Sequence, residues 1–157
     1  MIRPEDRRFQ AAAIELARQA AAHGNEPFGA VLVRRGEIVC TCENQIYTAH
    51  DPTFHAEAGL LRRYFAGGGC TDLRDCTLYA SCEPCFMCCG ALVWAKLGRL
   101  VYGASDRDLG ALLGEPGSDC AELVFSRSPH RPEVVGGVLR EESLAVLADY
   151  FRSHGKG

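Results

Sequence analysis

Apolar residues recur at two different spacings along the chain, and the change from one spacing to the other separates predicted helices from predicted strands. Near the N-terminus, Phe9, Ala13 and Leu16 recur at helical spacing. This pattern predicts an amphipathic helix that opens at Pro4, since a missing N–H is tolerated in the first turn. We expect the helix to stop near Gly24, because glycine is common just beyond helix C-termini.

Two short apolar runs follow, over residues 28–33 and 38–42, and they flank the pair Arg35-Gly36. Two such runs around a glycine turn predict a β-hairpin. Further strands are predicted over residues 76–80, 99–103 and 134–139. Further helices are predicted over residues 55–65, 85–96, 106–113 and 141–151. Residues 44–54 are predicted to form a loop, and residues 114–131 are predicted to be the least regular part of the chain.

A hairpin followed by alternating helices and strands predicts an α/β fold in which helices cover a mixed sheet. The chain has 157 residues, and no internal repeat or linker divides its pattern. That length is typical of one domain with its own core. We therefore predict a single domain over residues 1–157.

The overall charge argues against a surface built mainly to hold nucleic acid. The formal net charge is −3 at pH 7, whereas surfaces that bind nucleic acid attract it with basic stripes. A nucleic-acid partner is therefore possible but disfavoured. Hydrophobic residues make up 47% of the chain, yet no apolar run is long enough to span a bilayer, and we expect no membrane association.

The cysteine content favours a reducing compartment. The chain has nine cysteines, an odd number, and its charged first ten residues lack the apolar stretch of a signal peptide. Cysteines that ligate a metal fit this composition better than a disulfide scaffold does. We therefore expect a cytoplasmic protein.

Two short motifs carry the chemistry of this chain. The first contains His55 and Glu57, and the second contains Pro84, Cys85 and Cys88. One imidazole and two thiolates are three protein ligands for a tetrahedral Zn²⁺, and three ligands leave one position for water, as in catalytic zinc sites. His55 and Cys85 each stand where a helix is predicted to begin, and the positive end of the helix dipole favours a thiolate there.

Glu57 is expected to move protons and not to bind the metal. The order His-x-Glu and then Pro-Cys-x-x-Cys resembles the signature of zinc-dependent nucleobase deaminases. This resemblance implies that Glu57 would take a proton from the zinc-bound water, pass it to a ring nitrogen and then protonate a departing amine. A carbonyl would replace the amino group, and ammonia would be released.

The same cysteines allow a rival metal site. Cys82, Cys85 and Cys88 share the spacing that opens bacterial iron–sulfur runs, in which a fourth cysteine would fall at position 92. That position holds Leu92. Zinc is therefore the favoured metal, and Cys82 is expected at the edge of the pocket or in the core.

These motifs resemble the cytidine-deaminase-like superfamily, in particular the branch of bacterial guanine deaminases, tRNA adenosine deaminases and fungal-type cytosine deaminases. The resemblance covers nearly the whole chain and is carried by residues 27–31, 51–57, 78–88 and 90–91. It implies a three-layer sandwich with a five-stranded mixed sheet covered by helices on both faces. It also implies a homodimer or larger assembly, with His55, Cys85 and Cys88 as zinc ligands and Glu57 as the proton shuttle.

The resemblance further implies a set of substrate-binding residues. Asn44 stands where relatives hydrogen-bond the base or the sugar, although a turn-forming asparagine after a strand explains it equally well. The backbone around Ala56 and Ser81 would contact the ring and the leaving amine, and Phe28 would form the floor. Asp108 lies near an acidic residue of guanine deaminases, within a stretch whose match could shift by two residues.

Different segments of the chain resemble different groups of enzymes within this branch. Residues 81–85 and 90–95 are more similar to guanine deaminases, and residues 130–151 are more similar to the tRNA enzymes. Phe54 departs from both groups, which usually carry alanine there, so it would either reshape the pocket or fill the core.

Our leading hypothesis is a hydrolytic deaminase of a small amino-heterocycle, with guanine first. The main alternative is tRNA adenosine deamination. Cytosine, nucleosides and other aminated heterocycles, such as pterins or triazines, are close competitors. A non-catalytic zinc-binding partner subunit is the remaining alternative, which the intact Glu57 disfavours.

Overall fold

The strands of the protein form a single sheet with helices between them in the chain. The structure is a computed structural model, and it describes residues 1–68 and 71–154. The strands are β1 (Gly29–Arg34), β2 (Glu37–Glu43), β3 (Cys76–Cys82), β4 (Arg99–Ala104) and β5 (Glu133–Val135). The helices are α1 (Asp6–Ala22), α2 (Ala56–Ala66), α3 (Phe86–Trp94), α4 (Asp106–Leu113), α5 (Cys120–Ser126) and α6 (Arg140–His154).

The sheet is mixed, as the sequence predicts. Its strand order is β2-β1-β3-β4-β5. The predicted hairpin places β1 antiparallel to β2, and β1 also runs antiparallel to β3. β3, β4 and β5 are parallel to one another, which requires crossover connections, and α3 is the crossover between β3 and β4. This topology brings the C-terminal end of β3 directly to the start of α3.

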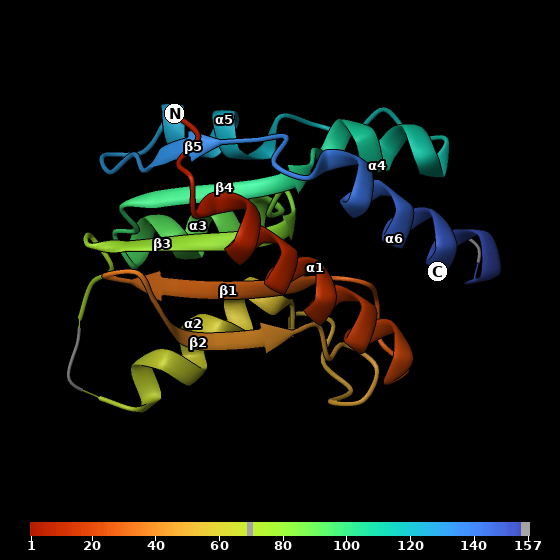
Figure 1. The fold of residues 1–157 in the computed structure, drawn as a ribbon, viewed down its shortest axis with the longest axis horizontal. Coiled ribbons are helices and arrows are strands. Elements are labelled where there is room, and N and C mark those ends of the chain that lie inside the picture. The colour runs from red at the N-terminus through yellow and green to blue at the C-terminus, as the bar shows by residue number, and fades with distance from the viewer. Residues whose placement is uncertain (69–70, 155–157) are drawn as a thin grey trace.

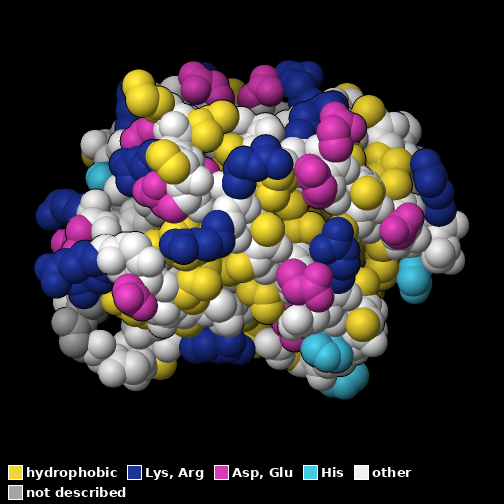
Figure 2. All heavy atoms as spheres, viewed as in Figure 1, with side chains coloured by type: hydrophobic (Ala, Val, Ile, Leu, Met, Phe, Trp, Pro, Cys, Tyr) yellow, Lys and Arg dark blue, Asp and Glu magenta, His cyan; other side chains and the backbone are white. Residues whose placement is uncertain are grey.

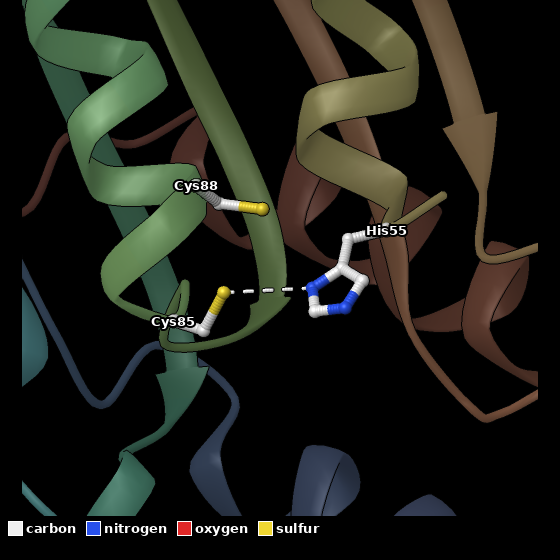
Figure 3. Close-up of side chains that lie close together, drawn as sticks. All are labelled: His55, Cys85 and Cys88. Carbon is white, nitrogen blue, oxygen red and sulfur yellow. Dashed lines mark hydrogen bonds between the residues drawn. The ribbon is translucent and has the colours of Figure 1, made fainter. Parts of the chain in front are cut away.

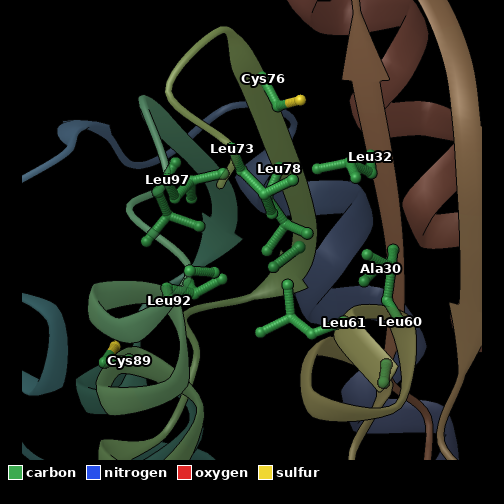
Figure 4. Close-up of a cluster of buried hydrophobic side chains, with 14 of the residues drawn as sticks. Ala30, Leu32, Leu60, Leu61, Leu73, Cys76, Leu78, Cys89, Leu92 and Leu97 are labelled. Atoms are coloured by element: carbon green, nitrogen blue, oxygen red, sulfur yellow. The ribbon is translucent and has the colours of Figure 1, made fainter. Parts of the chain in front are cut away.

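Helices cover both faces of the sheet, with α1 and α6 in front and α2 and α3 behind (Figure 1). Alternate residues of β1 enter the two cores, because side chains of a strand point to opposite faces. Ala30 and Leu32 pack in the cluster that includes residues of α2, α3 and α5 (Figure 4). Val31 and Val33 pack against α1. Since both faces are covered, the strand reads as a continuous apolar run.

The sequence predictions are wrong in two places. Residues 114–131, predicted to be the least regular part, include α5. Cys120 and Phe125 of this helix are buried in the core cluster with α3, so tertiary burial stabilises a short helix that local pattern does not reveal. The last strand is shorter than predicted: three residues, Glu133–Val135, pair with β4 before Gly137 adopts φ 83°.

A buried polar network ties α1 to the sheet. Asp6, at the start of α1, accepts hydrogen bonds of 2.7 Å from both terminal nitrogens of Arg99 on β4. The Tyr79 hydroxyl on β3 donates to the same carboxylate at 2.7 Å. Asp6 is 0% exposed and the Arg99 side chain 3% exposed. Charges this deeply buried require such pairing.

No helix in the described ranges combines the length and the apolar composition that crossing a membrane requires.

Candidate active site

Two helix N-termini supply the candidate metal ligands. His55 is the residue immediately before α2, and Cys85 is the residue immediately before α3; both have extended backbone conformations. Cys88 is the third residue of α3, so its side chain lies one turn on from Cys85. Because the two helices begin at the same end of the sheet, residues 30 positions apart in the sequence meet there.

The three side chains lie close enough to share one ion (Figure 3). The Cys85 Sγ atom is 3.5 Å from His55 Nδ1, and the three ligand atoms of His55, Cys85 and Cys88 all lie within 4.8 Å of one another. With ordinary Zn–S and Zn–N bond lengths, a tetrahedral ion holds its sulfur and nitrogen ligands about 3.5–3.6 Å apart. The spacing and the donor set therefore fit Zn²⁺.

The charges of the ligand group also suit a cation. A hydrogen bond from the Cys88 thiol lowers the pKa of Cys85 to about 4, and the nearby His55 acts in the same direction. The same bond keeps the proton on Cys88 and raises its pKa. The hydrogen bond with Cys85 raises the pKa of His55. The site thus already contains one thiolate, which is the form that binds a metal.

Glu57 lies beside these ligands in the first turn of α2. Its side chain is almost enclosed, with 6% exposure, and it lines the cavity that His55 and Cys85 also line. Burial, reinforced by the negative charge of Cys85, raises the pKa of Glu57 to about 7. A carboxyl group with a pKa near neutrality can both accept and donate a proton, which is the requirement for a shuttle.

The cavity beside Glu57 has a volume of about 190 Å³. Its lining residues are Glu26, Phe28, Asn44, His55, Glu57, Cys82, Glu83, Cys85, Asp106 and Leu109. Of the predicted substrate-binding residues, Asn44 and Phe28 are therefore at the cavity. The Asn44 Oδ1 atom accepts a hydrogen bond of 3.1 Å from the Ile46 backbone N–H, which orients the amide and leaves its NH₂ group as the donor available to a ligand.

The side chains of the other three predicted substrate-binding residues make contacts elsewhere. The prediction for Ala56 and Ser81 concerns the backbone around them, and their neighbours His55, Glu57 and Cys82 line the cavity. Ala56 is fully buried at the start of α2. The Ser81 hydroxyl accepts a hydrogen bond from the Gly29 backbone N–H, so it joins β3 to β1. Asp108 caps α4 together with Ser105 and forms an ion pair of 2.6 Å with Arg140. These contacts hold the Asp108 carboxylate away from the cavity.

The cavity also contains acidic residues that the sequence analysis did not single out. Asp106, two residues before Asp108, lines it in place of Asp108. Glu83 lines it as well, and its two carboxylate oxygens accept hydrogen bonds from the backbone N–H groups of Asp106 and Ala121. Glu26, which precedes β1, is the third such acidic residue. It belongs to no motif, and its position just before Pro27 is the only feature of the sequence that could have drawn attention to it.

Phe54 fills the core and does not line the cavity. It packs with the cluster behind the sheet, and its ring lies against Gly59 of α2, where an added Cβ atom would come within 2.7 Å of it. The bulky residue is thus accommodated by a glycine on the following helix turn.

The part of the chain that contains the candidate site matches a known protein family. A family model described as the cytidine and deoxycytidylate deaminase zinc-binding region matches residues 3–104. This stretch contains His55, Glu57, Cys85 and Cys88.

Several curated proteins are similar to this chain. A tRNA-specific adenosine deaminase of Bacillus subtilis is 36% identical over 148 residues, which cover 94% of this chain and 89% of the relative. A guanine deaminase of the same organism is 45% identical over 82 residues, covering 52% of this chain and 53% of the relative. A tRNA(Ile)-lysidine synthase of Deinococcus radiodurans is 41% identical over 140 residues. Those residues are 88% of this chain but only 23% of that longer protein.

Solved structures show the same two kinds of neighbour. One comes from a study of A-to-I editing by tRNA:A34 deaminases at the wobble position; its TM-score is 0.76 at 32% identity, covering 88% of this chain and 98% of that chain. Another is a guanine deaminase from Nitrosomonas europaea, with a TM-score of 0.80 at 26% identity, covering 96% and 85%.

Proposed function

The chain belongs to the family of zinc-binding cytidine and deoxycytidylate deaminases, and from this premise we propose that it removes an exocyclic amino group from a purine ring by hydrolysis. One observation carries the proposal. The side chains of His55, Cys85 and Cys88 meet within 4.8 Å, and the nearly enclosed Glu57 lines the cavity next to them. Three ligands beside an unligated acid form a site with one open position for water.

The residues of the chain divide the reaction between them. Zinc held by His55, Cys85 and Cys88 would act as a Lewis acid that makes water a stronger nucleophile at neutral pH. Glu57 accepts a proton from the attacking water and donates it to a ring nitrogen. The oxygen of this water bonds to the ring carbon that carries the amino group, and Glu57 transfers the second proton of the same water to that amino group. The C–N bond then breaks, so that ammonia leaves and a carbonyl remains.

The relatives support tRNA adenosine as the substrate. The similarity to the tRNA-specific adenosine deaminase of Bacillus subtilis extends over 94% of this chain, whereas the similarity to its guanine deaminase covers 52%. We therefore propose adenosine in a tRNA as the first candidate substrate, with inosine as the product.

The lining of the cavity supports a second candidate, free guanine. None of the described residues that line the cavity is Lys or Arg, and four of them are acidic. On the face shown in Figure 2, basic and acidic side chains are interspersed and form no continuous basic stripe. Both features suit a small neutral base better than a polyanion, whose binding depends on basic groups.

One experiment separates these substrates. Zinc-loaded protein is incubated with guanine, adenine, cytosine, their nucleosides, pterins and aminotriazines, and ammonia is measured; in parallel, inosine is measured in a tRNA sample by mass spectrometry. Glu57→Gln protein is the control for each reaction. If no sample releases ammonia and no inosine forms in the tRNA, the proposal is contradicted. That result would favour a non-catalytic zinc-binding subunit.

We also propose that the protein acts as a homodimer. Trp94 at the end of α3 is 87% exposed, and it borders a largely apolar groove lined by Leu61, Phe65 and Ala91, among others. A protruding aromatic ring and an apolar groove on the same face are self-complementary, as a twofold interface requires.

The remaining proposals concern location and extent. We propose a reducing compartment, the cytoplasm, because Cys85 and Cys88 must stay reduced to ligate zinc. We further propose that residues 1–157 act as one deaminase domain, since helices from both ends of the described chain pack on the same sheet.

A further inference from the structure

Among the acidic residues that line the cavity, Glu26 is the one whose carboxylate accepts no hydrogen bond from a described residue. Burial raises the pKa of Glu26, and the nearby charge of His55 acts in the opposite direction. Glu83 is held by two backbone N–H groups, and Asp106 accepts a hydrogen bond of 2.7 Å from the Ser118 backbone N–H. No described residue donates a hydrogen bond to the Glu26 side chain. It is only partly exposed and lines the cavity with Glu57 and His55.

The backbone around Glu26 is held firmly in place. The preceding residue, Asn25, is buried, and its Oδ1 atom accepts hydrogen bonds from the backbone N–H groups of Tyr47 and Thr48 at 3.0 and 3.1 Å. Its amide nitrogen donates to the Thr48 hydroxyl at 3.0 Å. The following residue is Pro27, whose ring fixes the backbone. A rigid segment therefore presents an unpartnered carboxylate to the cavity, as expected of a group that orients a ligand.

We propose that Glu26 is a specificity-determining residue, whose carboxylate accepts a hydrogen bond from a ring N–H of the bound heterocycle. The inference rests on the proposed deaminase function and names the class of substrate for it. That class is an amino-heterocycle with a ring N–H donor in addition to the amino group that leaves. An ionised carboxylate only accepts hydrogen bonds, so a ring that offers it nothing but acceptors would leave it unpaired.

This requirement separates the two candidate substrates. Free guanine carries a ring N–H at N1 and another on its imidazole ring. Adenosine within RNA has no ring N–H, because its ring nitrogens are acceptors or bear the sugar. Glu26 therefore favours guanine and rings like it over a tRNA adenosine.

The first test compares Glu26→Ala and Glu26→Gln with the wild type on guanine. Glu37→Gln, an exposed glutamate of β2 away from the cavity, is the matched control. A hydrogen bond to a charged group has a strength that corresponds to about a tenfold to hundredfold change in kcat/KM. We expect a loss of this size for Glu26→Ala, a smaller loss for Glu26→Gln and none for the control, with zinc content and melting temperature unchanged.

Methylated substrates distinguish recognition from a structural role. 1-Methylguanine and 9-methylguanine each lack one ring N–H. One of them should be a poorer substrate than guanine for the wild type, and the same methyl group should cost Glu26→Ala little further activity, because its partner is already missing. The inference is overturned if Glu26→Ala matches the wild type on guanine, or if each methyl group costs both proteins equally.

A binding measurement tests the role of Glu26 without requiring that the protein turn over guanine. Guanine is titrated calorimetrically into zinc-loaded Glu57→Gln and into the Glu26→Ala/Glu57→Gln double variant, neither of which needs to react. Binding at least about tenfold weaker in the double variant supports the inference even if no deamination is found. Equal binding, or no guanine binding by a protein that forms inosine in tRNA, overturns the role of Glu26 and leaves the deaminase proposal standing.

Discussion

Replacing Asp6 by Asn should destabilise the protein by breaking the ion pair with Arg99, the most deeply buried of those between described residues. Asn has nearly the same shape as Asp, and its amide oxygen can still accept hydrogen bonds from the Tyr79 hydroxyl and from Arg99 Nη1. Its NH₂ group cannot accept the bonds that Asp6 Oδ2 receives from Arg99 Nη2 and the Arg3 backbone N–H, so the change removes the charge and these two bonds. The Arg99 guanidinium, with 3% exposure, would then stand opposite a neutral group. Besides a bond to the remaining amide oxygen, it would keep its bond to the Met1 backbone oxygen and its contact with the partly exposed Glu133.

Two lines of reasoning give the same magnitude. Removing one partner of a buried pair costs about 3–5 kcal/mol, since the other charge is left uncompensated. Burial alone would raise the pKa of Asp6, but hydrogen bonds from Arg99, the Arg3 backbone and Tyr79 lower it to about 2. The difference from an unfolded aspartate corresponds to about 2–3 kcal/mol. We expect the free energy of unfolding to fall by about 3 kcal/mol, the overlap of the two ranges.

The sign of the pH dependence follows from the lowered pKa. A carboxylate with a depressed pKa stabilises the fold fully above its unfolded pKa, near 4, and this contribution is lost as the pH falls toward 2. The stability difference between wild type and Asp6→Asn should therefore be constant from pH 7 to 5 and shrink below about pH 4. Loss of zinc in acid affects both proteins, so the difference between them is the informative quantity.

Urea unfolding followed by circular dichroism, at fixed excess zinc, measures this difference. A thermal scan should show a fall in melting temperature of about 6–12 °C for a loss of 3 kcal/mol in a chain of this size. The control is Glu133→Gln, which removes a partly exposed charge next to the same Arg99 and should cost no more than about 1 kcal/mol. The reasoning fails if Asp6→Asn unfolds within 1 kcal/mol of the wild type at pH 7, or if the difference grows as the pH falls.

Three further predictions test the site and the assembly, and a fourth variant, Cys89→Ala, is a control. Glu57→Gln should retain zinc and melting temperature but lower kcat by about 10²–10⁴-fold in the ammonia or inosine assay; near-normal turnover would remove Glu57 from the mechanism. Cys88→Ala should lose stoichiometric zinc, measured by atomic absorption, and with it thermal stability. The control is Cys89→Ala, which changes a neighbouring buried cysteine outside the ligand group and should keep its zinc. Zinc retained by Cys88→Ala would disprove the ligand set. Trp94→Glu should reduce the mass measured by light scattering from dimer to monomer, and an unchanged mass would place any interface elsewhere.

The sequence predicted most of the fold because its signals are local. The hairpin around Arg35-Gly36 needs only a turn between two apolar runs, and the strands buried on both faces read as continuous apolar segments. The structure places β1 (Gly29–Arg34), β2 (Glu37–Glu43) and α4 (Asp106–Leu113) close to the predicted ranges. α5 was missed because Cys120 and Phe125 form a helix only where α3 offers them a core.

The candidate site also combines features that are local in the sequence with contacts that arise only in the folded chain. The types and spacing of His55, Cys85 and Cys88 are sequence properties that predict a metal with an open position, and the structure brings these ligands within 4.8 Å. Asp108 could not be distinguished from Asp106 by sequence, because residues two positions apart at a helix start point in different directions. Only the fold shows that Asp108 is engaged by Ser105 and Arg140, while Asp106 lines the cavity.

The sequence by itself thus determined the chemical class of the protein, since the candidate metal ligands and the candidate proton shuttle are recognised by residue type and order. The tertiary structure decided which other groups line the cavity beside these residues. Glu26 lies about thirty residues before His55 in the sequence and belongs to no motif, yet it lines the same cavity. Which distant side chains share a cavity depends on how helices pack on the sheet, and that packing is a property of the whole fold.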